Sequence, residues 1–228
     1  MVTYENGPNA PVTHTWAQSH ILNLISSHHV DWIFTSHWLK KNNENGAPCS
    51  FPNDKTTGFK IKLYAHLLLS ADIQQRNYPD LYPRRPLLCT ECHSDIYNNS
   101  HIGFCPAHLT SLNHDLNIAA TYLCSLILSS PSAPPGTTDI LPLIRRSSLF
   151  SPVFNINHPI YLLLHQLVPE ELISVISLHI RSRKNGMVIM ETFIQYFYSQ
   201  ITQKYWRIHS SSFHSWELSC RITKRKKK

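Results

Sequence analysis

The sequence predicts a mainly α-helical fold with one small irregular or hairpin segment in its first half. Apolar residues recur at helical spacing over several stretches, whereas the alternation of apolar and polar residues that is typical of strands is lacking. Only 6 of the 228 residues are glycine and 15 are proline. Because proline fixes one backbone angle and removes a donor, this composition favours helices joined by stiff turns.

Three helices are expected before the middle of the chain. Residues 15–26 and 31–39 carry bulky apolar side chains at helical spacing, and Asp31 is a suitable N-cap for the second of these helices. A polar loop over 40–52 separates them from a longer pattern at 57–77, where most apolar side chains share one face. A turn with three closely spaced prolines ends this pattern.

A further helix at 105–129 is followed by a stretch rich in serine and proline. We therefore expect a helical region at 1–128, a linker at 129–142 and a second helical region at 143–228.

The second region is expected to contain three helices. Patterns at 158–168 and 169–183 come first, and a turn at 184–186 separates them from a long helix that begins near position 187. The aromatic side chains between Tyr196 and Trp216 make this last helix a candidate surface for a protein partner.

The chain carries a formal net charge of +7, and its basic residues gather in two places. Arg84 and Arg85 follow the proline-rich turn. A basic tail comprises Lys224, Arg225, Lys226, Lys227 and Lys228. A basic balance favours polyanions such as RNA or DNA, although a terminal charge run is also typical of a solvated, disordered end. We expect these residues to provide most of any affinity for nucleic acid.

The beginning of the sequence is polar and lacks the pattern of a signal peptide, and the apolar runs are too short to span a bilayer. We expect an intracellular protein with no membrane partner. A nuclear location is one interpretation of the basic tail.

The most specific chemical signal is a group of four residues, Cys89, Cys92, His101 and Cys105, spaced C-x2-C-x8-H-x3-C. Two thiolates separated by two residues can bind one ion from a single turn, and a His and a Cys one helical turn apart can complete a tetrahedron. In a reducing compartment this clustering indicates metal rather than a disulfide. We expect one structural zinc ion in a zinc-binding segment at 86–108.

His108 is an alternative nitrogen ligand, because Cys105 and His108 are also at chelating spacing. His93 is a poorer choice, since adjacent ligands rarely reach one ion without strain. We expect His101 to be the ligand. The remaining histidines, His209 among them, have no acidic partner at H-E-x-x-H spacing and are expected to be structural or surface residues.

Several features around the cluster occur together in one family. A helical stretch containing Lys60 and Lys62 is followed by a tyrosine- and proline-rich turn at 76–83, the Cys pair, and an H-I-x-x-C sequence at 101–105. A closing aromatic helix then ends in basic residues. This arrangement resembles the zinc-knuckle-like segment near the C-terminal end of non-LTR retroelement polyproteins, downstream of their reverse transcriptase and ribonuclease H domains.

The resemblance implies that Cys89, Cys92, His101 and Cys105 are metal ligands. It implies no catalytic residues, because the matching region lies outside the polymerase and ribonuclease H domains. The chain is expected to be a C-terminal segment derived from such an element.

No sequence motif indicates an enzyme. The chain has no P-loop, no G-x-G-x-x-G and no G-x-S-x-G, and its 14 acidic residues are spread thinly, whereas phosphoryl chemistry needs clustered carboxylates around divalent metal. We expect a non-catalytic zinc-binding module that binds nucleic acid. The alternatives are a helical scaffold for protein interactions with structural zinc, and a non-functional transposon relic.

Overall fold

The computed structural model describes residues 29–41, 51–133, 139–151 and 158–227. Within the second of these ranges, side chains are described from position 57 onward. The fold is mainly α-helical, as the sequence predicts, and the described residues contain no β-strand. The α-helices are α3 (Trp32–Lys40), α4 (Phe51–Tyr64), α5 (Ala71–Asn77), α6 (Asn99–Ile102), α7 (Leu109–Leu128), α8 (Leu141–Arg146), α9 (Pro159–Leu164), α10 (Glu170–His179), α11 (Arg183–Phe197) and α12 (Gln203–Ser219). Two 3-10 turns, η1 (Pro106–His108) and η2 (Ser148–Phe150), and one π-helical turn, η3 (Tyr198–Thr202), complete these elements.

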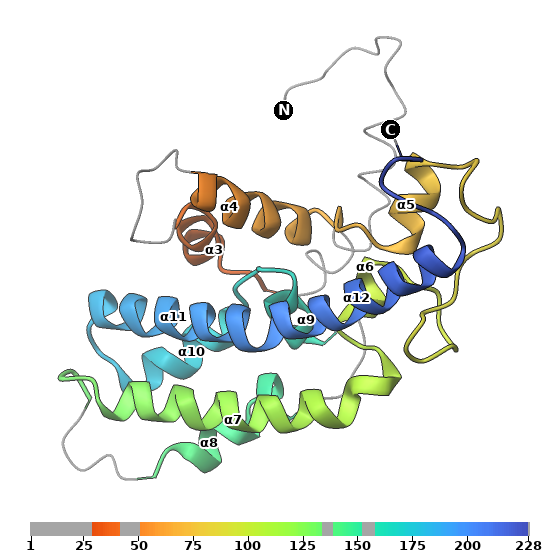
Figure 1. The fold of residues 1–228 in the computed structure, drawn as a ribbon. Coiled ribbons are helices and arrows are strands. Elements are labelled where there is room, and N and C mark those ends of the chain that lie inside the picture. Colours follow the sequence, from red (N-terminus) through yellow and green to blue (C-terminus); the bar gives the residue numbers. More distant parts are fainter. Residues whose placement is uncertain (1–28, 42–50, 134–138, 152–157, 228) are drawn as a thin grey trace, which may run out of the picture.

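Two long helical rods organise the molecule. One is α7, and the other consists of α11, η3 and α12, which continue one another (Figure 1). α7 packs on α11 and α8, α10 packs along α11, and α3 packs on α4. The far end of α12 reaches α5, α6 and the cysteine-rich segment, so the second rod links the main helical body to that segment (Figure 1).

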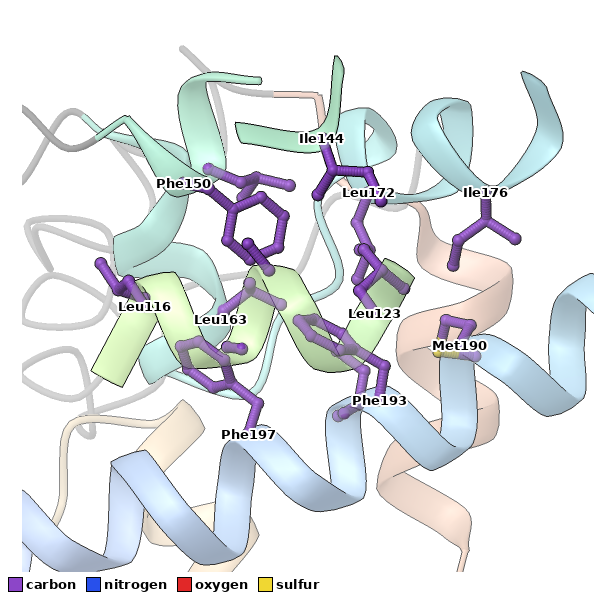
Figure 2. Close-up of a cluster of buried hydrophobic side chains, with 14 of the residues drawn as sticks. Leu116, Leu123, Ile144, Phe150, Leu163, Leu172, Ile176, Met190, Phe193 and Phe197 are labelled. Carbon is purple, nitrogen blue, oxygen red and sulfur yellow. The ribbon is translucent and has the colours of Figure 1, made fainter. Parts of the chain in front are cut away.

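The main hydrophobic core lies between α7, α11 and the helices that cover them. Leu116 and Leu123 of α7 project toward Phe193 and Phe197 of α11, and all four side chains are almost fully buried (Figure 2). Further buried residues of this core are Ile144, Phe150, Leu163, Leu172, Ile176 and Met190. Burying one such side chain contributes about 1.5–3 kcal/mol.

The same core contains residues from both sides of the expected linker at 129–142. That stretch separates the two regions along the chain, and positions 134–138 within it lie outside the described residues. The helices of both regions nevertheless pack into one core.

The aromatic helix that we expected to offer a surface for a protein partner is largely used inside the fold. Phe197, Ile201 and Tyr205 are 1–2% exposed, and Tyr198 packs edge-on against Trp38 at 6.1 Å between ring centroids. These side chains hold the second rod against the rest of the molecule, so they do not form a free apolar face.

The single helix expected at 57–77 is wrong, because α4 and α5 are separate helices. His66 adopts a left-handed backbone with φ of 54°, which ends the first helix. Leu68 then turns inward and is 2% exposed. The amide side chain of Asn99 donates to the carbonyl oxygen of Leu68 and accepts from its N–H, both at 3.1 Å. Burial of Leu68 and its two hydrogen bonds to Asn99 take the place of a continued helix.

The turn expected at 184–186 is also wrong, because these residues form the first turn of α11. Ser182 caps that helix, and its Oγ accepts a hydrogen bond from the N–H of Asn185. The helix expected at 15–26 lies outside the described residues. The helices expected at 31–39, 105–129, 158–168 and 169–183 correspond to α3, α7, α9 and α10 with changed ends.

Candidate metal centre

The first two cysteines lie in a tight hairpin-like loop, in agreement with the irregular or hairpin segment that the sequence predicts. An antiparallel bridge joins Leu88 and Ile96, and the N–H of Cys89 donates to the carbonyl oxygen of Asp95 at 2.7 Å. His93 has a φ of 58° and donates its N–H to the carbonyl oxygen of Cys89. This turn directs Cys89 and Cys92 toward the same point.

The other two predicted ligands come from short helical turns that follow. Asn98 caps α6, and its side chain accepts from the N–H of His101 at 2.9 Å. Cys105 precedes η1, whose His108 N–H donates to the carbonyl oxygen of Cys105 at 2.9 Å. These local turns place His101 and Cys105 opposite the cysteine pair.

The structure brings the four predicted ligands together. One ligand atom each from Cys89, Cys92, His101 and Cys105 lies within 4.8 Å of the others, so the cluster can hold a metal ion. The Sγ atoms of Cys89 and Cys105 are 3.9 Å apart, and Cys92 Sγ is 3.5 Å from His101 Nε2. A tetrahedral zinc ion gives ligand separations of about 3.8 Å between two sulfurs and about 3.5 Å between sulfur and nitrogen. The residues therefore fit the ion that the sequence predicts.

The electrostatics of the cluster favour the thiolate at Cys89, which is the form in which cysteine binds metal. The contact with the sulfur of Cys105 lowers the pKa of Cys89 well below its ordinary value, and the same contact raises the pKa of Cys105. Burial of His101 opposes its charged form, but the neighbouring Cys89 raises the pKa of the imidazole above its ordinary value.

His108, the alternative nitrogen ligand, belongs to a different group. Its ligand atom groups with those of Cys105 and His209, all within 4.8 Å of one another, and not with those of Cys89, Cys92 and His101. Its Nε2 is 3.4 Å from Glu91 Oε2. Burial lowers the pKa of His108, and His209 adds to this effect. The geometry thus favours His101 as the nitrogen partner of the three sulfurs.

His209 is the residue of this region that the sequence analysis missed. It lies on α12, is 1% exposed, and its Nδ1 is 3.6 Å from Cys89 Sγ. The signal that could have found it is a row at helical spacing, because Tyr205, His209 and Phe213 share the buried face of α12. A polar residue in the middle of a buried row needs a partner.

A second, smaller hydrophobic core attaches the cysteine-rich segment to α12. Tyr97 stacks on His209 at 5.7 Å and lies 5.0 Å from Phe213, measured between ring centroids. Further buried members are Ala71, Tyr82, Cys89, Ile102, Cys105 and Ile222. The metal cluster is therefore part of this core and not an isolated surface loop.

The basic residues that we expected to contact nucleic acid lie near the same segment. Arg84, Arg85, Lys224, Arg225 and Lys226 are exposed, and Lys228 lies outside the described residues. Lys227 differs from this expectation. Its Nζ is 2.8 Å from Glu217 Oε1 and 5.6 Å from the ring centroid of Tyr82, so its charge is already paired within the molecule.

A surface pocket of about 510 Å³ lies beside the cluster. Arg85, Thr90 and His93 contribute polar groups to its wall, and Phe213 and Trp216 contribute aromatic rings. Trp216 stacks on Phe213 with a centroid distance of 5.4 Å and an interplanar angle of 14°. The pocket thus combines a guanidinium group with an aromatic stack.

No known protein family, no curated protein and no solved structure matches this chain. Among the described helices, none is both long and apolar enough to cross a membrane.

Proposed function

We propose that this chain is a non-catalytic, zinc-stabilised module that binds single-stranded nucleic acid, and that it derives from the C-terminal region of a non-LTR retroelement polyprotein. The observation that carries the binding role is the pocket beside the metal cluster that Arg85 and Trp216 both line. The resemblance in sequence supports the origin.

The ligand chemistry supports zinc. Three sulfurs and one imidazole nitrogen match structural zinc sites, which leave no open position for a substrate. Two of the sulfurs and the imidazole are at least nine-tenths buried, so solvent has little access to the centre. In such sites the free energy of metal binding is also folding free energy.

The pocket supports recognition of unpaired bases. Aromatic side chains stack single-stranded bases with about 1–3 kcal/mol each, and a nearby arginine can contact phosphate. Trp216 is half-buried and Arg85 is exposed, so one can offer a ring face and the other a charge. Arg84 and the exposed tail residues Lys224, Arg225 and Lys226 add positive charge to the same part of the molecule.

The test is a titration of labelled single-stranded and duplex oligonucleotides with zinc-loaded protein at several salt concentrations. Replacing Arg84 and Arg85 with alanine should weaken binding across sequences and reduce the salt slope by about one for each lost phosphate contact. The matched control is replacement of Arg145 and Arg146 on α8, which are also adjacent and exposed. That variant should bind as the wild type does.

A second comparison separates stacking from charge. Trp216→Ala should weaken binding with little change in the salt slope, because it removes a ring and no charge. Trp206→Ala, on the same helix and outside the pocket, is its control. Binding that ignores salt, or no binding at micromolar protein with zinc present, would contradict the proposal and favour the interaction scaffold or the non-functional relic.

A further inference from the structure

The region around Cys105 holds more potential ligands than one tetrahedral ion can use. Cys89, Cys92, His101 and Cys105 form one group, and Cys105, His108 and His209 form another. A tetrahedral ion takes four ligands. Once the first group is satisfied, the two imidazoles of the second group remain beside Cys105.

These two imidazoles have buried nitrogen atoms without hydrogen-bond partners. Nε2 of His108 and Nε2 of His209 both lie out of contact with solvent and form no hydrogen bond, and His108 Nε2 has only an ion-pair contact with Glu91 at 3.4 Å. Leaving a buried polar atom unsatisfied costs about 1–3 kcal/mol. This free-energy cost applies fully to His209, because its side chain is 1% exposed and cannot turn toward water.

The contact that His209 makes through Nδ1 leaves the lone pair of its Nε2 available for a metal ion. Its Nδ1 faces Cys89 Sγ at 3.6 Å. A sulfur that binds metal is a thiolate and accepts hydrogen bonds, so Nδ1 of His209 carries the proton. In a neutral imidazole with a proton on Nδ1, the lone pair is on Nε2, which is then a metal ligand.

Glu91 supplies an oxygen at the same place. Its Oε2 is 3.4 Å from His108 Nε2, and both side chains are only partly exposed. A carboxylate and two imidazoles are ligands that zinc accepts, and a thiolate sulfur has further lone pairs with which to bridge two ions.

We propose that the protein binds a second metal ion through Cys105, His108 and His209, with Glu91 as the fourth ligand and the Cys105 thiolate bridging the two ions. The inference rests on the proposed zinc site, because Cys105 is shared. Its consequence is structural. The second ion joins the cysteine-rich segment directly to α12, whose His209 is 120 residues from Cys89 along the chain.

The metal content of the purified 228-residue chain tests the inference. We expect two zinc ions per chain in the wild type. His108→Ala, His209→Ala and Glu91→Gln should each reduce the content to one ion. His214→Ala, on α12 and largely exposed, is the matched control and should keep two.

Cobalt substitution gives an independent measurement that separates the two sites. The first site should show intense sulfur-to-cobalt charge transfer from three thiolates, and the second should contribute absorption from one sulfur only. His209→Ala should therefore remove part of the d–d absorption and retain most of the charge transfer. His108→Ala should give the same difference, which guards against a fold defect in either variant.

The outcomes distinguish the two proposals. One ion in the wild type, unchanged by any of the three substitutions, overturns the second site and leaves the zinc module intact. No bound ion overturns both. Loss of all metal in each of the three variants also overturns the second site, because these residues would then serve a single centre.

Discussion

Nδ1 of His209 lies 3.6 Å from Sγ of Cys89, although 120 residues separate them in the sequence. One residue belongs to the metal loop and the other to the long rod that also packs in the main core. We therefore expect metal binding and docking of α12 to be coupled, since both depend on the position of the Cys89 sulfur.

Removal of metal should loosen two separate segments. We expect a chelator to abolish hydrogen-exchange protection at 86–108 and to reduce it in the second half of α12, because the small core around Tyr97 loses its centre. Protection in α7 and α11 should persist, since their core does not include the cluster. Equal loss of protection across all helices would contradict this division.

Cys92→Ser should abolish stoichiometric metal binding at the predicted site. Oxygen replaces one of three sulfurs, and a serine hydroxyl is a poor zinc ligand at neutral pH. The matched control is Cys220→Ser, because Cys220 is an exposed free cysteine beyond the end of α12. A metal content in the first variant equal to that of the wild type, measured by elemental analysis, would exclude Cys92 as a ligand.

The local part of this site could be predicted from the sequence, and the distant part could not. Cys89, Cys92, His101 and Cys105 lie close together in sequence, so their spacing alone indicates a shared ion. The approach of His209 depends on how the second rod packs. No short-range pattern encodes that packing.

The prediction of a single helix at 57–77 is wrong for a related reason. Apolar residues at 57–77 fit one amphipathic helix, but the structure breaks it to bury Leu68 and to bond its backbone to Asn99. Periodicity describes which residues are apolar. It does not show that a partner more distant in sequence offers a better burial site.

Phe193→Ala should be among the most destabilising single changes in the chain. Phe193 is fully buried between α7 and α11, and removing its ring leaves a cavity that costs about 3–5 kcal/mol. Leu178→Ala, with Leu178 79% exposed on α10, should change the free energy of unfolding by less than about 0.5 kcal/mol. Urea denaturation of both variants measures the difference, and similar values would show that the core is packed differently.

Acid should destabilise the fold through His165. This imidazole stacks on His66 at 4.1 Å, and its Nδ1 is 3.1 Å from the carbonyl oxygen of Leu63. Burial, with a smaller effect of His66, lowers the pKa of His165 well below its ordinary value of 6.5. Below that value the unfolded chain binds a proton that the folded chain does not, so the free energy of unfolding falls as pH falls.

The measurement compares urea denaturation near neutral pH with that about one unit below the ordinary histidine pKa. His165→Gln keeps a donor for Leu63 and should show a smaller loss between the two pH values than the wild type. His114→Gln, at an exposed position on α7, should match the wild type. Any effect of acid on the metal ligands is common to all three proteins. Identical losses in all three would show that His165 does not contribute.

Lys226 and Lys227 are adjacent, but they should differ in their effect on nucleic-acid binding. Lys227 forms an ion pair with Glu217 and covers the ring of Tyr82, whereas Lys226 is exposed. Glu217 is itself buried and accepts the hydroxyl hydrogen of Tyr82. The charge of Lys227 is thus already neutralised by Glu217 when nucleic acid binds, while the charge of Lys226 can replace counterions on the phosphates.

We expect Lys226→Ala to reduce the salt slope by about one if it contacts phosphate, and Lys227→Ala to leave the slope unchanged. Lys227→Ala should instead lower the free energy of unfolding by about 1–3 kcal/mol, because it leaves a buried carboxylate with fewer partners. Anisotropy titrations and urea denaturation of the two variants check both effects, and a larger change of slope in Lys227→Ala would show that its ion pair opens when nucleic acid binds.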